Sequence, residues 1–160
     1  MTKRRRRVRK FFLTVGYSGL SPIASGTVGT AVALPIGILI LQFVPPATLL
    51  LLSILITLIA INEINKYETY YDIHDPSEIV IDELVGIWIT LSMTNSIPII
   101  WQIILSFIMF RFFDIWKPSI IGRIERKANG GISVMLDDVI AGFFAGVAVN
   151  GIWILIDKWF

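Results

Sequence analysis

Long apolar runs recur along the chain, and they constrain its fold more than any other feature of the sequence. They lie at 28–44, 47–61, 79–93, 97–113 and 139–156. At a rise of about 1.5 Å per residue, helices over the first and last runs nearly cover the roughly 30 Å hydrocarbon layer of a bilayer. The middle runs are shorter and would tilt or insert only partly. We therefore predict an all-α, polytopic helical membrane protein with about four to five membrane segments.

Composition supports this class of protein. Of the 160 residues, 55% are hydrophobic and 16% are charged, whereas charged residues make up about a quarter of an ordinary soluble domain. We expect a single domain over residues 1–160, because two domains would leave too little chain for either core. The absence of cysteine excludes disulfides, thiolate catalysis and cysteine-based zinc sites. Polar chemistry is left to carboxylates, lysine, arginine, hydroxyls and one histidine, His74, which we interpret as part of a solvated loop.

Two short turns divide the first four apolar runs into pairs. Pro45 and Pro46 separate the first two runs, and the segment "TNSIP" at 94–98 separates the next two. Proline, asparagine and serine all favour loops. The sequence therefore predicts two tight helical hairpins.

The distribution of basic residues predicts the topology. The cluster at 3–10 favours a cytoplasmic N-terminus and would attract anionic lipid head groups. Alternating crossings then place the polar segments 62–78 and 114–138 in the cytoplasm, and the two short turns, which carry no Lys or Arg, outside. Nucleic-acid binding by the basic cluster is the alternative, but the sequence that follows belongs in lipid, so we expect no nucleic-acid partner.

Five carboxylates fall at the predicted cytoplasmic ends of the membrane segments. They form three groups: Asp82 with Glu83, Asp114 alone, and Asp137 with Asp138. An ionised residue at mid-bilayer costs at least about 2.5 to 3.5 kcal/mol, and less near the interface. A single carboxylate can simply mark where a helix leaves the membrane, but three groups at one depth favour convergence on a cation. Oxygen ligands with little histidine and no thiol suit Mg²⁺.

A phosphate-containing substrate would also need positive charge. Arg111 and Asp114 are spaced i, i+3 on one helical face, and Lys117 follows one turn later if the helix continues. Two interpretations of Arg111 remain open: contact with a phosphate, or a side chain that extends toward the membrane interface.

The segment "GYSGLSPIASGTVGT" at 16–30 is rich in glycine and hydroxyl groups. Glycine permits close approach of the backbone, and hydroxyls can donate hydrogen bonds to phosphoryl oxygens. The candidate phosphate-binding hydroxyls are Ser21, Ser25, Thr27 and Thr30. The segment lacks the Gly-Lys-Ser/Thr ending of a Walker A loop, and the same residue types also pack membrane helices closely.

Four sequence blocks together resemble the phosphatidylglycerophosphatase A family of bacterial membrane lipid phosphatases. They are "GLSPIASGTVGT" (19–30), "DPSEIVIDELVG" (75–86), "FRFFDIWKP" (110–118) and "GGISVMLDDVIAG" (130–142). The resemblance implies Mg²⁺-dependent hydrolysis of the phosphomonoester of phosphatidylglycerophosphate to phosphatidylglycerol and inorganic phosphate, in phospholipid biosynthesis. It also implies a multi-pass protein of the bacterial cytoplasmic (inner) membrane, with its active site on the cytoplasmic side. Ser25 stands where the family often has a proline, which affects the rigidity of that loop but no charged group.

The resemblance assigns roles to the residues singled out above. The catalytic acids are expected to be Asp82, Glu83, Asp114, Asp137 and Asp138. Of these, Asp82, Glu83, Asp137 and Asp138 are the expected metal ligands. The expected phosphate-binding residues are Arg111, Lys117, Ser21, Thr27 and Thr30. Water activated by a carboxylate and a covalent aspartyl-phosphate are both open as the route of hydrolysis.

Two other classes of function also place acids at membrane depth or use helical hairpins. A cation channel or transporter would line a pathway with polar groups that continue to the far side of the membrane, whereas the outer halves of these segments are apolar. A structural or assembly protein would explain the hairpins and the basic cluster, but not acids and cations at one interface. The expected partners are therefore the lipid substrate and membrane lipids, with no obligate protein partner evident.

Overall fold

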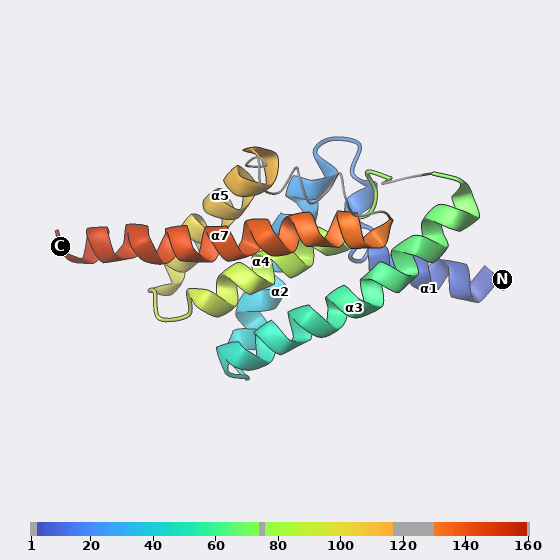
Figure 1. Ribbon diagram of the computed structural model, residues 1–160. Helices are drawn as coiled ribbons and strands as arrows, with labels where there is room; N and C mark the ends of the chain where they lie inside the picture. Colours follow the sequence, from blue (N-terminus) through green and yellow to red (C-terminus); the bar gives the residue numbers. More distant parts are fainter. Residues whose placement is uncertain (1–2, 74–75, 117–129, 160) are drawn as a thin grey trace.

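A computed structural model describes residues 3–73, 76–116 and 130–159, and all regular structure in these residues is helical. This confirms the all-α class. The α-helices and one 3-10 turn are α1 (Lys3–Leu13), η1 (Ser18–Leu20), α2 (Ser25–Leu41), α3 (Pro46–Tyr71), α4 (Ile81–Met93), α5 (Ile99–Trp116) and α7 (Gly131–Asp157). They form an elongated bundle with the two termini at opposite ends (Figure 1). The two predicted hairpins are present as α2–α3 and α4–α5.

Three helices, α3, α5 and α7, are long and apolar enough to cross a membrane. Helix α2 is apolar but shorter, which agrees roughly with the predicted number of segments. Helix α4 differs from the others because it has only 13 residues, or about 20 Å at the helical rise. It packs against α7, α3 and α2 (Figure 1), and every residue from Glu83 to Leu91 is buried. Helix α4 is therefore the centre of the bundle, enclosed by the longer helices.

The last helix begins earlier than its apolar run suggested. The sequence placed this segment at 139–156, with the aspartates at its head, but α7 starts at Gly131. Gly130 adopts a positive φ of 64°, and the N–H of Gly131 donates to Oδ1 of Asn65 on α3 at 2.7 Å. This contact satisfies one of the free N–H groups of the helix start. Asp137 and Asp138 consequently lie about two turns inside α7.

Helices α4 and α7 touch through their backbones at Gly86 and Gly142. A Cβ atom added to Gly142 would overlap the carbonyl oxygen of Gly86. The hydroxyl of Thr90 lies between the two helices, 3.1 Å from the carbonyl oxygen of Gly86 and 3.0 Å from that of Gly142. Small residues commonly allow membrane helices this close approach. Because Glu83 precedes Gly86 and Asp138 precedes Gly142 by about one turn each, the contact brings these two carboxylates together.

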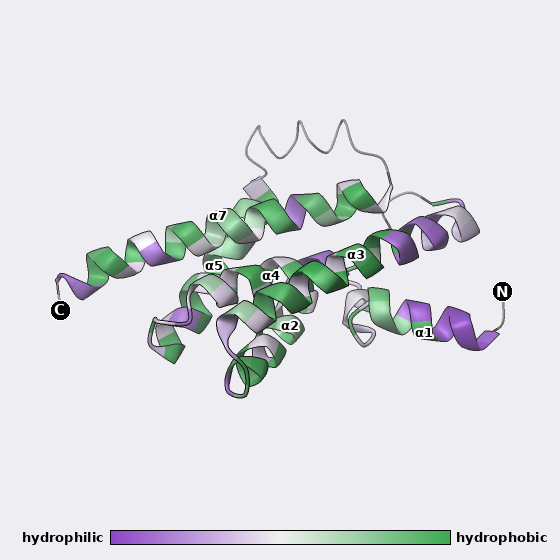
Figure 2. Ribbon diagram, turned by 60° about the horizontal axis from the view of Figure 1, so that its bottom comes forward, coloured by the Kyte–Doolittle hydropathy of each residue, from purple (hydrophilic) through white to green (hydrophobic). Residues whose placement is uncertain are grey.

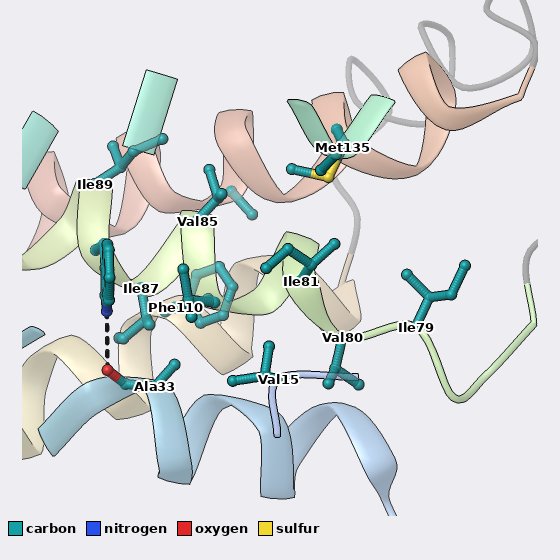
Figure 3. Packing of buried hydrophobic residues seen from close by; sticks show 14 of the residues in the cluster. Val15, Ala33, Ile79, Val80, Ile81, Val85, Ile87, Ile89, Phe110 and Met135 are labelled. Atoms are coloured by element: carbon teal, nitrogen blue, oxygen red, sulfur yellow. Dashed lines mark hydrogen bonds between the residues drawn. The ribbon is translucent and has the colours of Figure 1, made fainter. Parts of the chain in front are cut away.

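A layer of apolar side chains fixes the other helices around α4. Figure 3 shows Ile87 of α4 beside Phe110 of α5 and near Ala33 of α2, while Val80, which directly precedes α4, lies close to Val15. The indole Nε1 of Trp88 donates to the carbonyl oxygen of Ala33 at 2.9 Å, the dashed line in Figure 3. This bond satisfies the polar atom of a large aromatic side chain inside the core.

Helix α1 is tied to the polar end of α3. Arg9 pairs with Glu63 at 2.7 Å, and Lys10 pairs with Glu78, in the segment before α4, at 2.8 Å. Hydrophilic residues are concentrated in α1 and in the neighbouring part of α3, whereas the rest of the bundle is mostly apolar (Figure 2). The molecule therefore has one strongly polar end, which contains the N-terminus.

Candidate functional site

Three carboxylates from three helices converge within the bundle. Glu83 of α4, Asp114 of α5 and Asp138 of α7 each place a carboxylate oxygen within 4.8 Å of the other two. Glu83 and Asp138 are only 8% and 4% exposed. The structure thus brings together one member of each of the three acidic groups in the sequence.

Arg111 connects this carboxylate group to α2. Its Nη1 donates to Oε2 of Glu83 at 2.6 Å and lies 2.8 Å from Oδ2 of Asp114. The hydroxyl of Thr30 donates to the same Glu83 oxygen at 3.1 Å. The Nε of Arg111 is buried and has no hydrogen-bond partner among the described residues.

Negative charge is in excess at the convergence point. The charges of Glu83, Asp82 and Asp114 all act on Asp138, whose side chain is also within hydrogen-bond contact of Asp114. Buried charges of one sign are costly unless they are paired, protonated or coordinated. Arg111 compensates only part of this charge, so the group has the electrostatic character of a cation site.

The other two predicted metal ligands lie beside the group of three. The Oδ1 of Asp82 accepts the backbone N–H of Glu83 at 3.0 Å, so this side chain hydrogen-bonds to the first turn of α4. Asp137 is buried in α7 and, as the neighbour of Asp138, points about 100° away from it around the helix axis. In contrast, Asp114 belongs to the group, although the sequence did not place it among the ligands.

The predicted phosphate-binding hydroxyls are spread over the site (Thr30), the first turn of α2 (Ser25 and Thr27) and the loop before it (Ser21). Thr30 contacts Glu83, whereas the hydroxyl of Ser21 donates to the carbonyl oxygen of Ile23 at 2.8 Å. The hydroxyl of Ser25 donates to the carbonyl oxygen of Ser77 at 2.7 Å. Thr27 lies in the first turn of α2. Lys117 and His74 lie outside the described residues.

Gly26 is a residue of the site that was not singled out from the sequence. A Cβ atom at this position would overlap Oε1 of Glu83 and would lie 3.3 Å from Nη1 of Arg111. Gly26 and Thr30 are spaced i, i+4 and therefore share one face of α2. This spacing was the available signal, and it places a small residue and a hydroxyl against the same carboxylate.

Comparison with known proteins agrees with a membrane-embedded phosphatase. A family model described as phosphatidylglycerophosphatase A matches residues 11–153. A protein of Bacteroides thetaiotaomicron named "Putative phosphatidylinositol-3-phosphatase" is 40% identical over 82% of this chain and 85% of its own length. The phosphatidylglycerophosphatases A of Escherichia coli and Haemophilus influenzae are 38% and 36% identical, over 81% and 89% of this chain and 75% and 89% of their own lengths. No solved structure matches the chain.

The membrane helices, the site and these relatives define an enzyme of the phosphoric monoester hydrolase class. Within that class, the chain belongs to the phosphatidylglycerophosphatase A family.

Proposed function

We propose that this enzyme hydrolyses the phosphomonoester of phosphatidylglycerophosphate to phosphatidylglycerol and inorganic phosphate, as a Mg²⁺-dependent step of phospholipid biosynthesis. The observation that carries the proposal is the convergence of Glu83, Asp114 and Asp138 beside Arg111. Phosphoryl transfer commonly needs two elements: carboxylates that hold a cation, and a positively charged group that binds the phosphate.

The donor set fits Mg²⁺ because it consists of carboxylate oxygens alone. Glu83, Asp114 and Asp138 would hold the ion. Bound there, Mg²⁺ would neutralise charge on the phosphoryl oxygens. Asp82 and Asp137, each adjacent in sequence to one of these acids, would support them from the outer shell.

Arg111 would orient the phosphoryl group. Its Nη1 is held by Glu83 and Asp114, which fixes the guanidinium plane. Its buried Nε would donate to a phosphoryl oxygen, and charge-assisted bonds of this kind are among the stronger ones in proteins. Lys117, which the sequence places one turn beyond Asp114 if the helix continues, would add a second positive charge.

Hydrolysis breaks the bond between phosphorus and the glycerol oxygen. A carboxylate of the site would take a proton from water as the water oxygen bonds to phosphorus, and the carboxyl group so formed would return that proton to the leaving glycerol oxygen. Attack by an aspartate, followed by hydrolysis of the aspartyl-phosphate, is the alternative route. The stereochemistry at phosphorus separates the two routes, because a single displacement by water inverts a chirally labelled phosphoryl group, whereas two displacements through an aspartyl-phosphate retain its configuration.

We place the site on the cytoplasmic side of the bacterial inner membrane. The basic residues of α1 lie at the polar end of the bundle, where α4 and its acids begin (Figures 1 and 2). Clusters of Lys and Arg favour the cytoplasmic side. The substrate's phosphate would then meet the site at the interface while its acyl chains stay at the depth of the bilayer.

A phosphatidylinositol phosphate is a second candidate substrate, because the relative at 40% identity carries the name of a phosphatidylinositol-3-phosphatase. Phosphate release from both lipids by the purified protein, with and without Mg²⁺, tests the proposal. We expect faster release from phosphatidylglycerophosphate and loss of activity on chelation. Faster release from phosphatidylinositol 3-phosphate would reassign the substrate, and full activity in chelator would remove the metal from the proposal.

A further inference from the structure

An apolar groove lies on the outside of the bundle between α2 and α5. It has a volume of about 390 Å³ and is lined by Ala31, Leu34, Ile103, Ile104, Phe107 and Ile108. Ile104 and Ile108 remain 44% and 50% exposed, so the groove opens away from the core. Since α5 is long and apolar enough to cross a membrane, we expect this opening to face hydrocarbon.

The groove ends next to the candidate active site. Thr30 lies one turn before Leu34 on the same face of α2, and Arg111 lies one turn after Phe107 on the same face of α5. Nη1 of Arg111 lies 3.5 Å from the hydroxyl of Thr30, so these two residues mark the polar side of that end. From Arg111 to Ile103 the path along α5 covers about 12 Å at the helical rise. A molecule that extends from the guanidinium into the groove therefore passes from a charged to an entirely apolar environment.

We infer that this groove holds an acyl chain of the lipid whose phosphate is hydrolysed, and that the lipid reaches the site sideways between α2 and α5. The inference rests on the proposed function. A membrane lipid has the required polarity, because its phosphate lies at the interface and its chains run along the bilayer normal. The lining residues are all hydrocarbon side chains, which match a flexible alkyl chain and offer nothing to a polar ligand.

Substitutions that fill the groove test the inference. Ala31→Trp and Ile104→Trp would occupy it from its two walls. Val32→Trp is the matched control, because Val32 is 37% exposed, follows Ala31, and points about 100° away from it around the helix. Each protein is assayed in detergent micelles with dioleoyl phosphatidylglycerophosphate and with the dibutyroyl form, whose chains are too short to fill the groove.

For the two groove variants we expect KM for the dioleoyl substrate to rise by about tenfold, because buried methylene groups supply the lost binding energy. Their kcat/KM for the dibutyroyl substrate should stay within about twofold of the parent, and Val32→Trp should match the parent on both substrates. Parent-like constants for both groove variants would overturn the inference. So would equal losses on both substrates, since these would indicate a distorted site.

A binding experiment separates this inference from the proposed function. Dioleoyl phosphatidic acid with a diazirine on one chain should label residues 103–108, and unlabelled phosphatidylglycerophosphate, but not phosphatidylcholine, should compete. Labelling that responds to neither competitor would mean ordinary lipid contact and would contradict the inference. If the parent hydrolyses neither lipid, the proposed function fails, while the competition result still decides what the groove binds.

Discussion

At the residue scale, the site depends on the pairing of one guanidinium with two carboxylates. Arg111 contacts both Glu83 and Asp114, so its charge is shared between organising the acids and meeting a phosphate. A side chain that only anchored the helix at the membrane surface would be expected to extend into solvent or lipid head groups. The pairing therefore argues against the anchoring interpretation of Arg111, whereas its contact with a phosphate stays a prediction.

Arg111→Ala should lower turnover at saturating substrate by about a hundredfold, as is typical when a group that stabilises transition-state charge is removed. Added salt should not mimic the loss. Because the substitution also leaves Glu83 without its buried partner, Arg111→Lys serves as the control. Arg111→Lys keeps the positive charge but loses the planar guanidinium. It should fold normally, with a turnover between those of the parent and Arg111→Ala. Parent-like turnover of Arg111→Ala in detergent would identify Arg111 as an interfacial anchor.

Asp138→Asn should reduce activity by about a hundredfold or more and shift the Mg²⁺ dependence to higher concentrations, because it removes one charge from the group of three. Asp82→Asn should lose less, since Asp82 lies outside that group and hydrogen-bonds to the backbone of α4. Asp157→Asn, at the far end of the same helix α7, is the control for insertion and folding. A Mg²⁺ titration of phosphate release makes the comparison, and an unchanged titration curve for Asp138→Asn would exclude it as a ligand.

At the element scale, the close contact of α4 and α7 determines whether the site forms. Gly86 and Gly142 allow the two backbones to touch, and Glu83 and Asp138 lie about one turn away on the same two helices. Any increase in the distance between these helices would separate the carboxylates. The packing of the bundle and the geometry of the site are therefore coupled.

Gly142→Val should destabilise the protein by about 1 to 3 kcal/mol through overpacking and should abolish most of the activity. Gly151→Val on the same helix is the control, because nothing lies within 4 Å of the added Cβ there. Thermal unfolding in detergent and phosphate release measure the two effects. If Gly142→Val behaves like Gly151→Val, the α4–α7 contact is looser than described.

The attachment of α1 should weaken in acid. Burial raises the pKa of Glu78, but hydrogen bonds from Lys10 and Tyr67 and the charge of Lys10 outweigh this, so its pKa lies below the ordinary glutamate value. A lowered pKa contributes stability at neutral pH that is lost as the pH falls through the folded-state value. Hydrogen exchange of α1 should therefore accelerate below the ordinary glutamate pKa. Glu78→Gln should exchange faster already at neutral pH and respond less to acid; an equal acid response in both proteins would contradict the role of Glu78.

The sequence predicted the hairpins and the acidic clusters well because both leave local signals: prolines in turns, and charges within apolar runs. It did not reveal that α4 is enclosed, since a short apolar run has the same pattern whether it faces lipid or other helices. It also misplaced the start of α7, because the contact between Gly131 and Asn65 joins residues far apart in the chain. For the same reason, it could not tell which member of each acidic pair faces the site.

At the scale of the whole molecule, charge is segregated toward one end of an apolar bundle (Figure 2). Asp82 and Glu83 lie in the first turn of α4, and Arg111 and Asp114 lie near the end of α5, whereas the turn between α4 and α5 lies at the opposite ends of these two helices. This arrangement suits an enzyme that meets its substrate's head group at one membrane surface. The positive-inside rule predicts that this is the cytoplasmic surface, and labelling experiments can test the prediction.

The chain has no cysteine, so single cysteines can report on topology without further changes. A cysteine added at the N-terminus or at 123–128 should be protected from an impermeant thiol reagent in intact cells and become reactive after permeabilisation. A cysteine at 94–96 should react in intact cells. External labelling at 123–128 would contradict the topology, because the acids would then no longer share one surface with the basic N-terminus.

The enclosure of α4 by its neighbours also has a consequence for how the enzyme is made. Glu83 leaves the ribosome long before Asp138, which belongs to α7, the last helix described. Until α7 has been synthesised and packed against Gly86, Glu83 of α4 and Asp114 of α5 lack the third carboxylate of the site. The nascent protein should therefore be inactive in the membrane during translation and should become active only after α7 has packed against α4.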